Sequence, residues 1–233
     1  MSGAEFLVLN PNTSAWMTAR VAERLRQLLG AGVAVHGWTA TEGPAVIDDA
    51  DSFAQGAAAL EPLARAALAR HPTALARHPT AGALLLACFG DPGLEALRQS
   101  AGMPVVGLAE CAMRQAAAEQ GAFAVLTCGP AWVPLLTQRA AQFGLADALV
   151  GVWALPVNGA EFAREPLRWR AALADAAEQA RQRGARALIL GGAVFAGFED
   201  LIDSALPRID ALQCAARALR LKLPGIAATP PAP

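Results

Sequence analysis

The amino-acid sequence predicts an α/β protein built on a parallel sheet with helices on both faces. Apolar segments of strand length alternate with longer amphipathic segments along the whole chain, which is the pattern of parallel strands joined by helical crossovers. The chain has 233 residues, of which 55% are hydrophobic and 17% are charged. This composition supplies enough apolar material for one large α/β domain or two small ones.

The first part of the chain predicts two strand–helix units. Residues 5–9 form an expected strand, and a turn over residues 10–14 leads into an expected helix over 15–29. Residues 33–38 predict the second strand, and the alanine-rich residues 51–69 the second helix. Asn10 and Asn12 in the first turn are either cap and turn residues or ligand contacts, because ligands of open parallel sheets bind beyond the carboxyl ends of the strands.

The segment after the second helix repeats itself. Residues 67–73 and 74–80 both read Ala-Leu-Ala-Arg-His-Pro-Thr, which we interpret as a local duplication that lengthens a surface connection. A proline follows each histidine and breaks any helical face that the two could share. The three histidines of the chain (His36, His71, His78) lie in unrelated sequence contexts and C-x-x-C is absent, so no metal site is expected.

The central stretch of the chain carries its most informative cysteine. Residues 83–87 form a continuous apolar run of strand length, and Cys88 follows where the strand ends. Asp91 and Pro92 predict a helix start, with Asp91 as N-cap and Pro92 in the first helical position. A helix N-terminus favours an anion, so the Cys88 thiol is expected to ionise readily and to act as nucleophile, metal ligand or proton-transfer base. The alternative is a buried structural cysteine; the polar, glycine-rich turn favours the functional interpretation.

The rest of the chain continues the alternation. Expected strands cover residues 104–108, 122–127, 150–155 and 185–190, and expected helices cover 109–120, 132–143, 167–183 and 211–221. Cys128 resembles Cys88 in following a strand and preceding glycine and proline, whereas Cys111 and Cys214 fall inside helices and are assigned to packing. The last expected strand ends in Gly191-Gly192-Ala193.

Several function classes are disfavoured by what the sequence lacks. A net charge of −1 argues against nucleic acid as a partner. No signal peptide and no apolar stretch of bilayer-spanning length is present, and four cysteines without close spacing fit a cytoplasmic protein. The dinucleotide, P-loop and G-x-S-x-G motifs are missing. The remaining candidate sites are four strand-end turns, which contain Asn10, Cys88, Phe89, Gly90, Thr127, Cys128, Gly129, Gly191, Gly192 and Ala193.

Four segments together resemble the hydantoin racemase branch of the aspartate/glutamate racemase superfamily. They are residues 9–14, 87–94, 104–110 and 190–193, and the likeness runs in order over nearly the full chain. The resemblance implies two similar parallel-sheet lobes related by pseudo-twofold symmetry, with the active site in the cleft between them. Residues 1–100 with 206–223 would form lobe one, residues 101–205 lobe two, and residues 224–233 a disordered tail.

The resemblance also implies a cofactor-independent racemase or epimerase that acts on a hydantoin or an amino-acid-like small molecule. One cysteine thiolate removes the acidic proton next to a carbonyl, a second thiol returns it on the opposite face, and backbone N–H groups of the strand-end turns hold the charged oxygens. Cys88 matches the first cysteine. Family members often form dimers or larger rings, so a homo-oligomer is expected.

One departure from the family pattern bears on the reaction. Many members carry the second cysteine in the turn where this chain has Gly191-Gly192-Ala193, and glycine cannot move a proton. Cys128 is the candidate replacement. Two alternatives stay open: a single-cysteine decarboxylase or cis–trans isomerase of a small diacid, and a catalytically silent binding protein. The aromatic residues Trp16, Phe89, Trp132 and Phe195 either accommodate a hydrophobic substituent or belong to the core.

Overall fold

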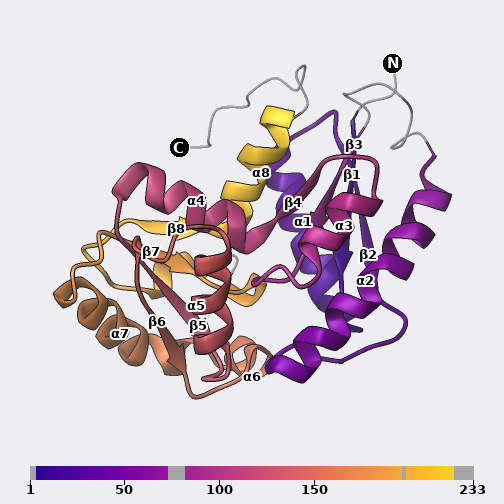
Figure 1. Ribbon diagram of the computed structural model, residues 1–233. Helices are drawn as coiled ribbons and strands as arrows, with labels where there is room; N and C mark the ends of the chain where they lie inside the picture. The colour runs from indigo at the N-terminus through magenta and orange to yellow at the C-terminus, as the bar shows by residue number, and fades with distance from the viewer. Residues whose placement is uncertain (1–3, 73–81, 196–197, 223–233) are drawn as a thin grey trace.

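The computed structural model describes residues 4–72, 82–195 and 198–222, and in this part of the chain eight parallel strands form two sheets of four (Figure 1). The first sheet has the order β2-β1-β3-β4 and the second the order β6-β5-β7-β8. The predicted α/β class and the two parallel-sheet lobes are therefore confirmed. The strands are β1 (Glu5–Asn10), β2 (Ala34–Thr39), β3 (Gly82–Leu86), β4 (Val105–Gly107), β5 (Phe123–Cys128), β6 (Leu149–Leu155), β7 (Ala187–Leu190) and β8 (Arg208–Asp210).

Helices connect the strands and cover both sheets. They are α1 (Ala15–Leu29), α2 (Ala50–Arg70), α3 (Leu94–Ser100), α4 (Leu108–Gln120), α5 (Trp132–Gln142), α6 (Gly159–Arg164), α7 (Arg170–Gln182) and α8 (Ala211–Lys222). Short 3₁₀ turns occupy Pro166–Trp169, Ala193–Phe195 and Glu199–Leu201. No helix among the described residues has the length and apolar character needed to cross a bilayer.

The sequence explains the central strands well. Every residue of β3 and β5 is buried, which fits their continuous apolar sequences because both faces of a parallel sheet are covered by helices. Helix α2 begins at a capping box, in which the Asp49 carboxylate accepts from the Ser52 N–H at 2.7 Å and the Ser52 hydroxyl accepts from the Asp49 N–H at 3.1 Å. Helix α1 has the predicted bounds.

Strand β8 and helix α6 were not predicted, and β8 changes the membership of the second sheet. The expected final strand at 185–190 is followed by β8, whose three residues pair with β7 and are too few to show a periodic pattern. The first sheet extends to β4, beyond the predicted boundary at residue 100, and β8 places residues 208–210 in the second sheet although they were assigned to lobe one. The predicted tail at 224–233 and residues 73–81 lie outside the described residues.

The predicted helix start after Cys88 is wrong. Helix α3 begins at Leu94, and its N-cap is Gly93 with a φ of +74°. The Asp91 carboxylate instead accepts from the backbone N–H groups of Ala109 and Glu110, at 3.2 and 2.8 Å, so it caps the N-terminus of α4. Asp91 is fully buried and has a φ of +54°, a left-handed conformation that aspartate tolerates better than most residues.

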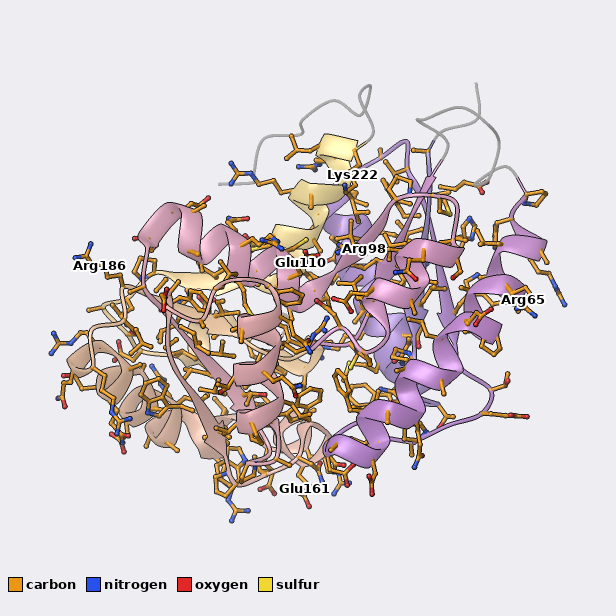
Figure 2. All side chains as sticks on the ribbon, viewed as in Figure 1. Arg65, Arg98, Glu110, Glu161, Arg186 and Lys222 are labelled. Atoms are coloured by element: carbon orange, nitrogen blue, oxygen red, sulfur yellow. The ribbon has the colours of Figure 1, made fainter. Side chains whose placement is uncertain are left out.

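The two halves are joined by helices and by ion pairs that cross between them. Helices α4 and α8 lie together over the region where the sheets approach each other (Figure 1). Arg139 of α5 pairs with Glu95 of α3 at 3.2 Å and donates to the backbone oxygen of Asp91. Glu110 of α4 pairs with Arg98 of α3, and the two side chains point toward each other in Figure 2. These contacts fix the segment after Cys88 against the second half.

Candidate functional site

A cavity of about 120 Å³ lies at the carboxyl ends of the strands and is lined by both halves. The turns after β3, β5 and β7 contribute Cys88, Cys128 and Gly192, and the loop after β2 contributes residues 45–48. This location agrees with the general position of ligand sites in open parallel sheets. Seven predicted site residues line the cavity: Cys88, Phe89, Thr127, Cys128, Gly191, Gly192 and Ala193.

Cys88 and Cys128 approach the cavity from different halves. Cys88 follows β3 of the first sheet, Cys128 ends β5 of the second, and neither forms a disulfide. Both are buried, with exposed fractions of 8% and 6%, yet both line the cavity wall. A small molecule in this space would therefore have one thiol from each half as a neighbour.

The expectation that Cys88 ionises readily is wrong. Burial raises the pKa of the Cys88 thiol far above its usual range, and the nearby Asp91 carboxylate raises it further. The expected helix dipole is missing because α3 begins six residues after Cys88. Burial also raises the pKa of the Cys128 thiol to about 12. Both environments therefore favour the neutral thiol over the thiolate in the ligand-free protein.

The two sheets show which residue of the second half corresponds to Cys88. The register pairs Leu9 with Leu86 in the first sheet and Leu126 with Leu190 in the second. The residue that follows β3 and the residue that follows β7 then make the same backbone hydrogen bond. The Ala87 N–H donates to the Leu9 oxygen at 2.8 Å, and the Gly191 N–H donates to the Leu126 oxygen at 2.7 Å. Gly192 therefore occupies the position equivalent to Cys88.

Three predicted contact residues do not line the cavity. Asn10 is fully buried, and its amide nitrogen donates to Asn12 Oδ1 and Thr18 Oγ1 at 2.8 and 3.0 Å, so it holds the first turn together. Gly90 has a φ of +113° and packs where a Cβ atom would lie 2.7 Å from the Trp132 ring. Gly129 has a φ of +89° and gives its N–H to the Leu155 oxygen. Their roles are structural.

Several lining residues were not assigned to the site from the sequence. The polar ones are Asn12, Ser14, Asp48 and Asn158, and the aromatic candidates Trp16 and Trp132 also line the cavity, whereas Phe195 does not. Asn12 and Ser14 belong to the strand-end turn that the sequence did single out, so the turn was informative although Asn10 was the wrong member. Asp48 and Asn158 come from loops that carried no recognisable signal.

Several hydrogen-bond donors of the lining residues have no protein partner within the described residues. Among them are the buried hydroxyl of Ser14 and the backbone N–H groups of Phe89 and Ala193. By contrast, the N–H groups of Gly191 and Gly192 are occupied by the Leu126 and Leu190 oxygens. The expectation that backbone N–H groups face the ligand therefore does not extend to this glycine pair.

The electrostatic character of the cavity is nearly neutral. Among its described lining residues Asp48 carries the only charge, and no lysine, arginine or histidine is present. Most of the wall is apolar, with Met17, Ile47, Phe89 and Val194 among its members. A free carboxylate would find no positive side chain here, whereas a neutral polar ring with an apolar substituent would find suitable neighbours.

Two of the three histidines lie together in the fold although their sequence contexts gave no sign of it. The rings of His36 and His71 are 4.1 Å apart between centroids, and Glu5 lies beside them. Within the described residues, these three side chains form the one group of potential metal ligands. They lie at the amino ends of β1 and β2, away from the cavity. His78 lies outside the described residues.

Comparison with known proteins gives a consistent picture. The family model described as Asp/Glu/hydantoin racemase matches residues 6–219. The hydantoin racemase of Paenarthrobacter aurescens is 30% identical over 217 residues, which cover 91% of this chain and 87% of that protein. The crystal structure of allantoin racemase from Pseudomonas fluorescens superposes with a TM-score of 0.82 at 25% identity, covering 98% of each chain. A mutant of arylmalonate decarboxylase shares the fold, with a TM-score of 0.64 at 12% identity over 98% and 96% of the chains.

Proposed function

This chain belongs to the Asp/Glu/hydantoin racemase family, and we propose that it is a cofactor-independent racemase of 5-substituted hydantoins or closely related cyclic ureides. The observation that carries the proposal is the pair of thiols, Cys88 and Cys128, which line one cavity from opposite halves. Two of the relatives are a hydantoin racemase and an allantoin racemase, and this supports the proposed substrate class.

The reaction divides between the two thiols. The Cys88 thiolate takes the proton from the ring carbon next to the carbonyl, so the C–H bond breaks, an S–H bond forms, and the electron pair moves onto the carbonyl oxygen. The Cys128 thiol then donates its proton to the opposite face of that carbon. The reverse direction exchanges the two roles, and each turnover leaves one thiol and one thiolate.

The unpartnered donors support the charge that develops during this step. We expect the N–H groups of Phe89 and Ala193, and the Ser14 hydroxyl after a rotation of its side chain, to donate to the ring oxygens, because these residues line a largely apolar cavity where hydrogen bonds to a developing oxyanion are strong. The raised thiol pKa values mean that only a small fraction of the protein carries the thiolate at pH 7, so the rate should rise with pH.

The cavity charge favours a neutral ring over a diacid. Asp48 would repel a substrate with two carboxylates, and no cationic side chain among the described lining residues would compensate. The single-cysteine alternative retains one supporting observation, namely that Gly192 stands at the position equivalent to Cys88. Under that alternative, Cys88 protonates a carbanion on one face and no inversion occurs.

A substrate series tests the proposal. Single enantiomers of hydantoins with isopropyl, benzyl or ureido substituents at carbon 5 are incubated with the protein, and optical rotation is followed over time. N-carbamoyl amino acids, aspartate and an arylmalonate serve as the charged comparison set. Faster loss of rotation with the hydantoins supports the proposal. Release of carbon dioxide from the arylmalonate, with no racemisation of any hydantoin, would contradict it.

A further inference from the structure

We propose that Glu5, His36 and His71 form a zinc-binding site that joins the C-terminus of α2 to the amino ends of β1 and β2. The three side chains each offer one ligand atom, and these atoms all lie within 4.8 Å of one another. Two histidines and one carboxylate are a common ligand set for zinc, with a fourth position left to water.

The fold explains why the three residues meet. Glu5 begins β1, and His36 lies opposite Leu7 in the register of β1 and β2. Because alternate residues of a strand point to the same face, Glu5, Leu7 and His36 share one face of the first sheet. Helix α2 covers this face, and His71 is its C-cap residue. The ligands therefore come from two strands and one helix end, which sequence spacing alone does not reveal.

The geometry is close to what the metal requires. His71 Nδ1 lies 3.8 Å from a Glu5 carboxylate oxygen, and the two imidazole rings are tilted by 34°. Ligand atoms around tetrahedral zinc are about 3.3 Å apart for bonds of about 2.0 Å, so modest side-chain rotations bring the three atoms into range. The side chains of His71 and Glu5 are about one-fifth exposed, at 19% and 21%, which leaves access for the ion and a water ligand.

The local charges also suit a divalent cation. The side chain of Glu5 brings a carboxylate to the two imidazole rings, and its negative charge favours a bound cation. The C-terminus of α2 carries the negative end of the helix dipole. Arg26 is the nearby opposing charge, and it is engaged by the Val35 backbone oxygen and by Glu23. Trp38 packs edge-on against the His71 ring and restricts its orientation.

The site is separate from the proposed chemistry. It lies at the amino ends of the strands, whereas the cavity lies at their carboxyl ends. Zinc bound here would attach α2 to the sheet within the first copy of the duplicated heptad, and it would stabilise the fold without touching the substrate. Metal binding should therefore change the thermal stability of the protein and leave racemisation unchanged.

Zinc titration of the full chain tests the site. The EDTA-treated protein is titrated with Zn²⁺ by calorimetry, and with Co²⁺ as a spectroscopic probe. We expect one equivalent of Zn²⁺ to bind, the melting temperature to rise by about 5 °C at saturation, and Co²⁺ to give visible bands typical of low coordination number. H36Q, H71Q and E5Q should each weaken binding at least about tenfold and abolish the shift in melting temperature.

The duplicated heptad offers a matched control. H78Q changes the same residue in the second copy of the heptad, and we expect it to bind Zn²⁺ like the wild type. Absence of Zn²⁺ binding to the wild type would overturn the proposal. So would a loss of binding in H78Q but not in H71Q, or intense near-ultraviolet thiolate bands in the Co²⁺ complex, which would assign the metal to the cysteines. Circular dichroism of each metal-free variant establishes that it is folded.

Discussion

The turn after β3 and the turn after β7 are built on the same backbone plan but carry different chemistry. In each turn, the N–H of the first residue after the strand donates to a backbone oxygen of the neighbouring strand, at 2.8 Å for Ala87 and 2.7 Å for Gly191. The next residue is Cys88 in the first half and Gly192 in the second. The difference teaches that the two halves retain equivalent backbone positions, while only the position in the first half carries a thiol.

Under the proposed mechanism, Cys128 supplies the second proton-transfer group from another strand of the second half. Cys128 is the last residue of β5 and lines the same cavity as Cys88. In the register of β5 and β7, Leu126 lies opposite Leu190, which precedes Gly191. In the first half, the residue equivalent to Cys128 is Pro11, because Leu9 and Leu126 occupy equivalent register positions. The proposed acid–base pair is therefore asymmetric, because Cys88 follows β3 of the first sheet whereas Cys128 ends β5, which is not the equivalent strand of the second sheet.

Removing the thiol of the first half should have the largest effect. We expect C88A to lower the racemisation rate about 10³-fold, because general acid–base groups contribute on this order and no other titratable group replaces Cys88 among the described lining residues apart from Cys128 and Asp48. Polarimetry with a 5-substituted hydantoin measures the rate. C111A, which removes a thiol inside α4, is the matched control and should retain activity. Wild-type activity in C88A would rule out the proposed mechanism.

The halves also differ at the third residue after Cys88 and the third residue after Gly192. It is Asp91 in the first half and Phe195 in the second. Burial raises the pKa of Asp91 to about 7 from 3.8, so the folded state binds a proton that the unfolded state lacks between about pH 4 and pH 7. In this window the unfolding free energy should fall as pH rises, by at most about 4 kcal/mol in total.

The variant D91N removes this titration while keeping an oxygen acceptor for the α4 N–H groups. We therefore expect urea unfolding of D91N to depend less on pH between 4 and 7 than that of the wild type. The same pH dependence in both proteins would show that Asp91 keeps a normal pKa in the folded state.

Restoring a thiol at the equivalent position of the second half is the next test. A Cβ atom at Gly192 would lie 3.5 Å from Phe195 and Val194, so the cavity has room for it, although its φ of +158° adds some strain. We expect G192C to raise the rate of inversion about tenfold, because it places a second thiol where the symmetry of the halves requires one. The neighbouring variant G191C should fold poorly, since its Cβ atom would lie 2.5 Å from Val125 and 2.8 Å from Phe89.

The variants G192C and G191C distinguish the effect of where the new thiol lies from the effect of adding a thiol at all. Both add one cysteine to adjacent residues of the same turn. If G192C is well folded but racemises no faster than the wild type, the equivalence of Gly192 and Cys88 has no catalytic meaning. Thermal melts establish the folding of each variant.

The smallest expected effect concerns the oxyanion donors. S14A removes the unpartnered hydroxyl of a cavity-lining residue and should lower kcat about tenfold, with little change in stability because the hydroxyl has no protein partner within the described residues. Thr13 is adjacent in the same turn but does not line the cavity, so T13A serves as the control. Equal rates for S14A and the wild type would remove Ser14 from the mechanism.

The sequence predicted the features that depend on local pattern. Helix α1 and the strand that leads to Cys88 follow from apolar spacing, and the four strand-end turns do contain most of the polar cavity wall. The pKa of Cys88 was misjudged because burial depends on tertiary packing that a strand-end motif does not reveal. The role of Asp91 also depends on tertiary packing. Its carboxylate caps α4, where the bonded N–H group lies 18 residues later in the chain, and not the helix α3 that follows it directly.

Other features arise only when distant segments meet. Glu5, His36 and His71 are separated by 31 and 35 residues, and their common face follows from the register of β1 and β2 together with the end of α2. Strand β8 has three residues, too few for a periodic signal. The equivalence of Gly192 and Cys88 was given by the family pattern, and the register of the two sheets provides its physical basis.

The most direct measurement of the proposed two-thiol mechanism follows proton exchange and inversion together in deuterated water. A single enantiomer of a 5-substituted hydantoin is incubated with the wild type and with C128S, and deuterium at carbon 5 and optical rotation are recorded on the same samples. The account expects the wild type to incorporate deuterium with inversion, and C128S to lose inversion while Cys88 still exchanges the proton with retention. Undiminished inversion in C128S would contradict it.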